Sequence, residues 1–242
     1  MAKQSGIGVR LYASGYDLNT DVSALAGVGS SQELLDVTAL ANSARARIPG
    51  VGDASISVNG FFDNAAGRSH ALYSSNSGAL PTTDQNVVIS MGTDRGDPAC
   101  GFAAKQATYT IDRAPGNAVA TSVSYEAADG YGLSWGVLLT DGPKQTDTSA
   151  TNSASVDNGS STTAGAVAVL QVETLTGTSA TVKVQDSPDD TVWADLLTFT
   201  AATDRTSEIV RDTGATTVDR YLRVTTTGVF TVCSFVLTVA RL

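Results

Sequence analysis

The sequence has little charge, few aromatic residues and a single histidine. Only 16% of its 242 residues are charged and 6% are aromatic, whereas an ordinary soluble domain has about 25% charged residues. The lone His70 leaves most acid–base catalysis and metal binding without their commonest side chain. This composition argues against many classes of enzyme.

Apolar segments long enough to cross a bilayer are also missing. No apolar run approaches the ~18–20 residues that a spanning helix needs, and the opening MAKQSGIGVR lacks the apolar stretch of a signal peptide. We therefore expect a protein that is made in a cytoplasm and has no membrane partner.

Positive charge is scarce and scattered. The chain has 15 Lys and Arg residues against 24 Asp and Glu, which gives a net charge of -9. A protein that reads nucleic acid shows a basic face, and an acidic surface repels phosphates. The charge balance therefore excludes a specific reader of DNA or RNA.

One short motif resembles the nucleophile site of a serine hydrolase. GLSWG at 132–136 fits the pattern G-x-S-x-G, which needs a strand-to-helix turn and an Asp and a His later in the chain. No histidine follows Ser134, and the next residues have the pattern of a strand. We interpret Ser134 as a strand residue and His70 as a helix-surface or interface histidine.

Acidic and thiol side chains give no stronger signal. Asp186, Asp189 and Asp190 cluster in a turn, where calcium binding is an alternative to ordinary turn chemistry. Cys100 is expected in a loop, where a reactive thiol stays open, and Cys233 is expected to be buried on the last strand. The sequence predicts no catalytic residue, no cofactor site and no metal site, and therefore no enzyme.

The chain divides into two parts at a polar segment. KQTDTSATNSASVDNGSSTTAG at 144–165 has Val156 as its only large apolar residue, so it cannot bury enough surface to form a core element. We interpret it as a linker, or as a linker followed by the edge of the next domain. With the boundary near Thr148, the domains are 1–147 and 148–242.

The second part has the period-2 pattern of an all-β domain. Apolar and polar residues alternate over short, Val- and Thr-rich runs, with turn signals at 175–178 and 186–190. This pattern predicts an antiparallel sandwich. The expected strands are 167–174, 180–185, 192–200, 207–211, 221–227 and 230–239.

The first part has a mixed pattern, typical of an α+β domain with one or two helices beside a sheet of about six strands. Helical spacing predicts a helix over 32–48 that ends at Pro49 and Gly50, although the first half of this segment also alternates as a strand would. A short helix is expected over 65–73. The expected strands are 53–63, 86–91, 103–112, 118–127 and 133–140.

Without a catalytic constellation, two β-rich domains indicate a protein that contacts other proteins through sheet edges and loops. The segments 13–31 and 74–83 are interpreted as loops that order on contact with another subunit. Trp193 and Tyr221 would allow a sugar-stacking platform, although we expect the single Trp of each part, Trp135 and Trp193, to lie in a core.

Several segments resemble one family. LLDVTAL (34–40), ARARIPG (44–50) and DASISVNGFFD (53–63) resemble the opening of the tail tube (major tail) proteins of long-tailed bacteriophages. In that family a Thr-containing segment, a short helical stretch ending near Gly and a strand closing in Gly-Phe-Asp or Gly-Phe-Asn follow one another in this order. GYGLSWGVLLT (130–140) and YLRVTTTGVFT (221–231) are similar to the versions in phages of actinobacteria.

The resemblance implies a mainly β fold. The first domain would be a β-sandwich or barrel-like tail-tube domain with a short flanking helix, and the second a small immunoglobulin-like sandwich that decorates the tube. Copies would form hexameric rings that stack into the virion's tail tube, with tape-measure and tail-terminator proteins as partners. DNA would pass through the lumen without specific binding.

The resemblance also places the assembly contacts. Residues 1–12 and the segment 13–33 would reach the next ring, and the segment 74–84 would do the same or pack laterally. Two alternatives remain from the residues alone: a capsid decoration protein, and a carbohydrate-binding adhesion module in residues 150–242 that uses Trp193.

Overall fold

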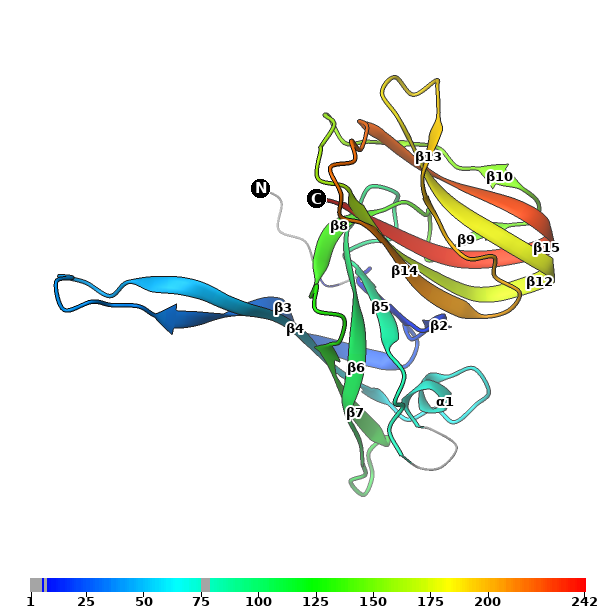
Figure 1. Cartoon of the computed structure of the whole chain (residues 1–242). Coiled ribbons are helices and arrows are strands. Elements are labelled where there is room, and N and C mark those ends of the chain that lie inside the picture. Colours follow the sequence, from blue (N-terminus) through cyan, green and yellow to red (C-terminus); the bar gives the residue numbers. More distant parts are fainter. Residues whose placement is uncertain (1–5, 7, 75–78) are drawn as a thin grey trace.

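The computed structural model describes residues 6, 8–74 and 79–242 of the chain. As the sequence predicts, the fold is mainly β, with one short helix beside a connected network of strands (Figure 1). None of the described helices is long and apolar enough to span a membrane. The sequence predicts assembly contacts in residues 1–12 and 74–84. Residues 1–5, 7 and 75–78 of these two segments lie outside the described residues, so only part of each segment can be compared with that prediction.

The N-terminal part is built on the long strand β6, which bends across it. Strand β6 pairs with β5, β7 and β8; β5 continues to β1 and β2, and β7 continues to β4 and β3. The elements are β1 (Arg10–Ala13), β2 (Tyr16–Asp17), β3 (Val22–Asp36), β4 (Arg47–Phe61), α1 (Ser69–Tyr73), β5 (Gln85–Ser90), β6 (Pro98–Asp112), β7 (Ala120–Ala127) and β8 (Ser134–Leu138).

The alternating residues of β4 show why this part folds. Ile56 and Val58 point to one face and are buried, as predicted, against Phe102 and Tyr125 from β6 and β7. The side chains between them face solvent, which is the pattern of a strand that covers a core on one side.

The helix expected over 32–48 is wrong. Residues 32–36 continue β3, and residues 47–48 open β4, with Leu35 opposite Ile48 in an antiparallel pair. The apolar residues that fit a helical period also fit a strand, and pairing with β4 decides between the two. The expected helix over 65–73 is shortened to α1.

The C-terminal part is organised by two very long strands, β12 and β15, which pair antiparallel along their whole lengths. Strands β13 and β14 pair with the other edge of β12, and β9, β10 and β11 pair with β15. The elements are β9 (Gln145–Asp147), β10 (Thr151–Asn152), β11 (Val156–Asp157), β12 (Ala166–Ser187), β13 (Ala194–Thr198), β14 (Thr206–Asp212) and β15 (Tyr221–Arg241).

The turn expected at 175–178 is wrong, because β12 runs through it. The pairing register shifts on both sides of Gly177, which lies opposite Phe230, and β15 carries Gly228 nearby, opposite Ala180. Both glycines have positive φ, at 147° and 127°. A Cβ on Gly177 would lie 2.4 Å from the Cα of Phe230. The glycines therefore allow two long strands to bend together, rather than to reverse.

The polar segment 144–165 is not a free linker. Its short strands β9, β10 and β11 lie along β15, and the hydroxyl of Thr226 donates to the buried carboxylate of Asp147 at 2.6 Å. Of the two interpretations of this segment, a linker followed by the edge of the next domain fits the structure better than a linker alone. Hydrogen bonds hold this segment in place, although it buries little apolar surface. Its backbone bonds to β15, and its own side-chain hydroxyls form further hydrogen bonds.

The two parts pack against each other through both apolar and polar contacts. A separate apolar cluster joins them, with Tyr12 and Val88 on one side and Val169 and Val236 on the other. The buried Gln171 side chain accepts from the backbone N–H of Gly15 at 2.7 Å and donates to a backbone carbonyl of β5 at 2.8 Å.

Candidate assembly interface

A two-stranded arm projects from the body of the protein. Residues 31–53, hereafter the arm, comprise the ends of β3 and β4 beyond the point where β4 pairs with β7 (Figure 1). All of its residues are exposed except Ala46 and Gly50, which are half-buried. At ~3.3 Å per residue, the paired segment 47–53 alone extends about 23 Å.

The arm carries large apolar side chains that nothing in the described structure covers. A lone two-stranded hairpin is marginally stable in water, and exposed apolar patches of this kind mark interaction surfaces. Leu40 is fully exposed and Val51 is 79% exposed. The apolar side chains of the arm are Leu34, Leu35, Val37, Leu40, Ile48 and Val51.

The tip of the arm, residues 37–46, is ordered by its own hydrogen bonds. The backbone N–H of Val37 donates to the carbonyl of Ala46 at 2.9 Å, and the N–H of Ala46 donates to the hydroxyl of Thr38 at 2.9 Å. Hydrogen bonds from the side chain and backbone of Thr38 hold the pKa of Asp36 below its usual range. The tip is therefore a defined structure that a partner can recognise without first ordering it.

The segment 13–31, expected to be a loop, is largely strand. It contains the end of β1, all of β2 and the first ten residues of β3, Val22–Ser31. The backbone of this segment is already paired with β4, so ordering on contact does not describe it. The Gly and Ser residues of this segment predict a loop, but antiparallel pairing with β4 makes most of it a strand.

The residues expected to be free of catalytic roles lie in ordinary structural positions. Ser134 opens β8 opposite Gly101, and His70 lies in α1. The Nδ1 atom of His70 lies 2.9 Å from the hydroxyl of Tyr109, and its ring packs 4.8 Å from that of Phe62. The Nε2 atom lies 3.4 Å from the hydroxyl of Ser74, which also donates to the His70 carbonyl at 3.0 Å.

Two of the three aspartates of the expected turn, Asp186 and Asp189, accept hydrogen bonds from the backbone, and Asp190 has a positive φ of 63°. Asp189 accepts from the N–H groups of Thr191 and Val192 at 3.0 Å, which lowers its pKa. Asp186 accepts from a backbone N–H at 2.9 Å. In the part of the chain that the structure describes, no group of three or more His, Cys, Asp and Glu side chains is placed to hold a metal ion.

Both thiols are buried. Cys233 lies on β15 with no exposed surface, as expected. Cys100 lies on β6, not in a loop, and is equally buried. The loop expectation was wrong because the Gly and Pro residues around Cys100 are accommodated at the start of a strand. Burial raises the pKa of Cys100 to about 12, which removes the nucleophilic thiolate at neutral pH.

The tryptophans are not core residues, which corrects the expectation. Trp135 is 49% exposed on β8, and Trp193 is half-buried before β13. The guanidinium of Arg223 lies 4.1 Å from the ring centroid of Trp193, and that of Arg220 lies 4.9 Å from the ring of Tyr221. Cation–π contacts thus occupy one face of each ring that a sugar would stack on.

A groove lies at the base of the arm, between the arm and the segment that joins β7 to β8. Its volume is about 620 Å³, and its lining includes Glu33 and Asp53 from the arm and Gly130 and Gly132 from the segment. The sequence does not predict this groove, because its walls come from segments far apart in the chain. It also gives no separate signal for Arg45 in the tip and Arg47 next to it, which are the only Lys or Arg residues between Arg10 and Arg68.

Comparisons with known proteins give distant likenesses. No family model and no curated protein sequence matches the chain. A chain in the tail of an empty gene transfer agent particle with C6 symmetry is 18% identical, with a TM-score of 0.42, over 55% of this chain and 98% of its own.

Two further structures resemble the chain over nearly its whole length. The SPP1 Dit protein, described as a hub of the adsorption apparatus in phages that infect Gram-positive bacteria, is 12% identical, with a TM-score of 0.36, over 96% of this chain and 98% of its own. A chain of the phage p2 baseplate in its activated conformation is 8% identical, with a TM-score of 0.36, over 97% and 98%. The three descriptions name a tail, a hub of an adsorption apparatus and a baseplate.

Proposed function

We propose that this chain is a structural protein of a phage-type tail and that it assembles with copies of itself through the arm. The observation that carries the proposal is the arm itself: a preformed hairpin with six large apolar side chains exposed to solvent. Covering this surface in an assembly would stabilise the hairpin by ~25 cal/mol for each Å² of apolar area removed from water.

The finer form of the proposal follows the resemblance to tail tube proteins. Copies form hexameric rings that stack into a tube with tape-measure and tail-terminator proteins, and the C-terminal sandwich decorates the outside. A chain with a net charge of -9 suits a conduit that DNA crosses without binding, because acidic surfaces do not hold phosphates.

Self-association of the full-length chain tests the proposal. We expect the wild-type protein to form rings or tubes of uniform diameter in negative-stain electron microscopy and large species in light scattering. A variant with Leu40→Ser and Val51→Ser should stay monomeric, because it loses apolar contact area on the arm.

The matched control is Val192→Ser with Val229→Ser. These side chains lie in the C-terminal part, away from the arm, and are 70% and 71% exposed. The control therefore also replaces two exposed apolar side chains by serine, but outside the arm. A wild-type chain that is monomeric at every concentration that its solubility allows would overturn the proposal. A discrete trimer would favour a capsid decoration protein instead.

A further inference from the structure

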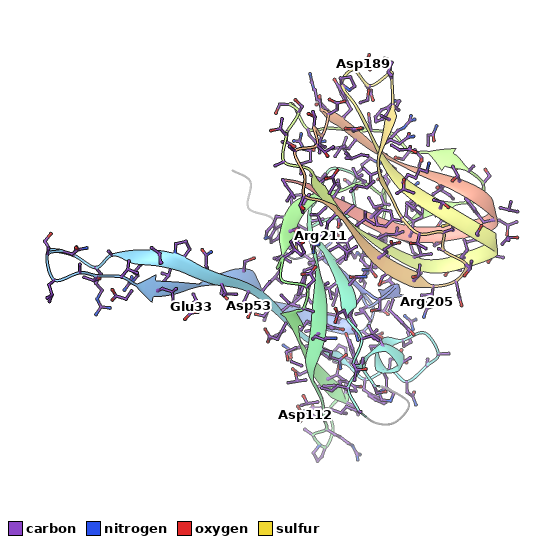
Figure 2. The ribbon with its side chains drawn as sticks, in the orientation of Figure 1. Glu33, Asp53, Asp112, Asp189, Arg205 and Arg211 are labelled. Carbon is purple, nitrogen blue, oxygen red and sulfur yellow. The ribbon has the colours of Figure 1, made fainter. Side chains whose placement is uncertain are left out.

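The arm carries opposite charges at its two ends. Arg45 belongs to the tip and Arg47 follows it at the start of β4. Glu33 and Asp53 lie nearer the body (Figure 2). All four side chains are exposed, and within the described residues none of them forms an ion pair. The arm therefore presents two cations at or next to its tip, with the exposed Asp36 opposite Arg47, and two further anions nearer the body.

The two anions belong to the groove at the base of the arm. Glu33, Val51 and Asp53 form one wall, and Ala127, Gly130 and Gly132 belong to the other. No basic side chain lines it. With its apolar Val51 and small residues opposite, the groove of about 620 Å³ suits an apolar side chain flanked by positive charge.

The second wall is held in place by the C-terminal sandwich. The guanidinium of Arg211 pairs with Asp129 and lies 4.4 Å from the ring centroid of Tyr131. The N–H of Tyr131 also donates to Asp129 at 3.1 Å. A wall fixed by three such contacts loses little conformational freedom when a ligand binds.

The tip cannot reach the groove of its own chain. The two strands pair from Ser31 opposite Asp53 to Asp36 opposite Arg47, with one register shift between Gln32 and Leu34, so they hold the tip away from the base. Whatever the tip contacts through its arginines must belong to another molecule, and the acidic groove is repeated on every copy of the chain.

We propose that the tip of one copy's arm docks in the groove at the base of the next copy's arm, with Leu40 against the apolar wall and with Arg45 and Arg47 beside Glu33 and Asp53. This inference rests on the proposed function and specifies its contact. The contact joins two different surfaces of the same chain, so it repeats head to tail. Repetition of such a contact gives a ring when it closes and a filament when it does not.

Charge reversal with rescue tests the contact in full-length protein. The tip variant carries Arg45→Glu and Arg47→Glu, and the groove variant carries Glu33→Arg and Asp53→Arg. Each alone should weaken association by about tenfold or more, because like charges then meet. An equimolar mixture should restore assembly, since each reversed tip meets a reversed groove and each native tip a native groove.

The matched control carries Asp112→Arg and Asp204→Arg, two exposed aspartates outside the arm. It makes the same change in net charge as the groove variant and should assemble as the wild type does. Thermal unfolding of every variant checks that the fold is kept.

The possible outcomes separate the two claims. A groove variant that assembles like the wild type, while Leu40→Ser with Val51→Ser does not, overturns the docking site and leaves self-assembly through the arm standing. A mixture that fails to restore assembly also overturns the docking site. A wild-type chain that never associates overturns the docking site together with the proposed function.

Discussion

The guanidinium of Arg211 pairs with the carboxylate of Asp129 and thereby ties β14 of the C-terminal part to the segment between β7 and β8. Both side chains are largely buried, at 12% and 19% exposed. The pair connects the two parts of the chain at the wall of the groove. The C-terminal part therefore contributes to the shape of the surface beside the arm.

Loss of this pair should loosen the wall. Arg211→Ala leaves the carboxylate of Asp129 without its charged donor, so we expect the free energy of unfolding to fall by about 1.5–3 kcal/mol. Urea denaturation measures this loss. Limited chymotrypsin digestion should also cut faster after Tyr131, which loses the guanidinium stacked on its ring.

Arg220→Ala is the control for this prediction. Arg220 pairs with Asp157 in an exposed position, where ion pairs contribute little to stability. It should cause the smaller loss and leave cleavage after Tyr131 unchanged. Equal losses for the two variants would contradict the role assigned to Arg211.

The buried amide of Gln171 makes a second test of the contact between the two parts. Gln171→Leu leaves the N–H of Gly15 without its acceptor, whereas the carbonyl of Asn86 loses the amide but keeps the N–H of Ser14 at 3.0 Å. An unsatisfied buried group costs about 1–3 kcal/mol, so we expect a clear drop in the urea midpoint. Gln171→Glu keeps an acceptor for Gly15, but its ionised carboxylate is buried against the carbonyl of Asn86 and should also lower the midpoint near neutral pH. A midpoint unchanged in Gln171→Leu would show that water or a shifted backbone replaces the amide.

The bend of the two long strands depends on glycine. In Gly177→Ala the new Cβ would lie 2.4 Å from the Cα of Phe230, at a φ of 147° that L-residues rarely adopt. We expect a loss of at least about 1–3 kcal/mol in thermal or urea unfolding. Gly29→Ala is the control, because its nearest neighbour would be 4.0 Å away. Similar stabilities for the two variants would contradict a packing role for Gly177.

The sequence predicts those elements whose apolar residues face a core. Ile56 and Val58 alternate and are buried, and the same alternation on β12 and β15 indicates an all-β C-terminal part. On β4 and on the 180–186 half of β12 the period of the pattern reports one covered face, whereas residues 166–172 and 233–240 are buried on both faces.

Where apolar residues cover no core, the same reasoning fails. Leu34 and Ile48 fit a helical period only on the assumption that they face inward, yet they are 59% and 48% exposed on the arm. In the proposed assembly their environment is another copy of the chain, which intrachain patterns do not encode. The groove could not be predicted from the sequence for a related reason, because Glu33 and Gly130 come together only through the pairing of β4 with β7.

The two cysteines provide a prediction about reactivity. Cys100 and Cys233 have no exposed surface, and burial raises their pKa values from 9.0 to about 12 and about 11. At pH 8 the native protein should therefore not react with a thiol reagent, whereas both cysteines should react in denaturant. Because the folded-state pKa values are raised, the stabilisation from the neutral thiols is complete below pH 9 and is lost as the pH rises toward these values. Fast labelling of the native wild type, lost in Cys100→Ser, would contradict the buried position of Cys100 on β6. An inert native background also means that a label introduced by Leu40→Cys reports on the arm alone, so that its protection on assembly measures burial of the tip directly.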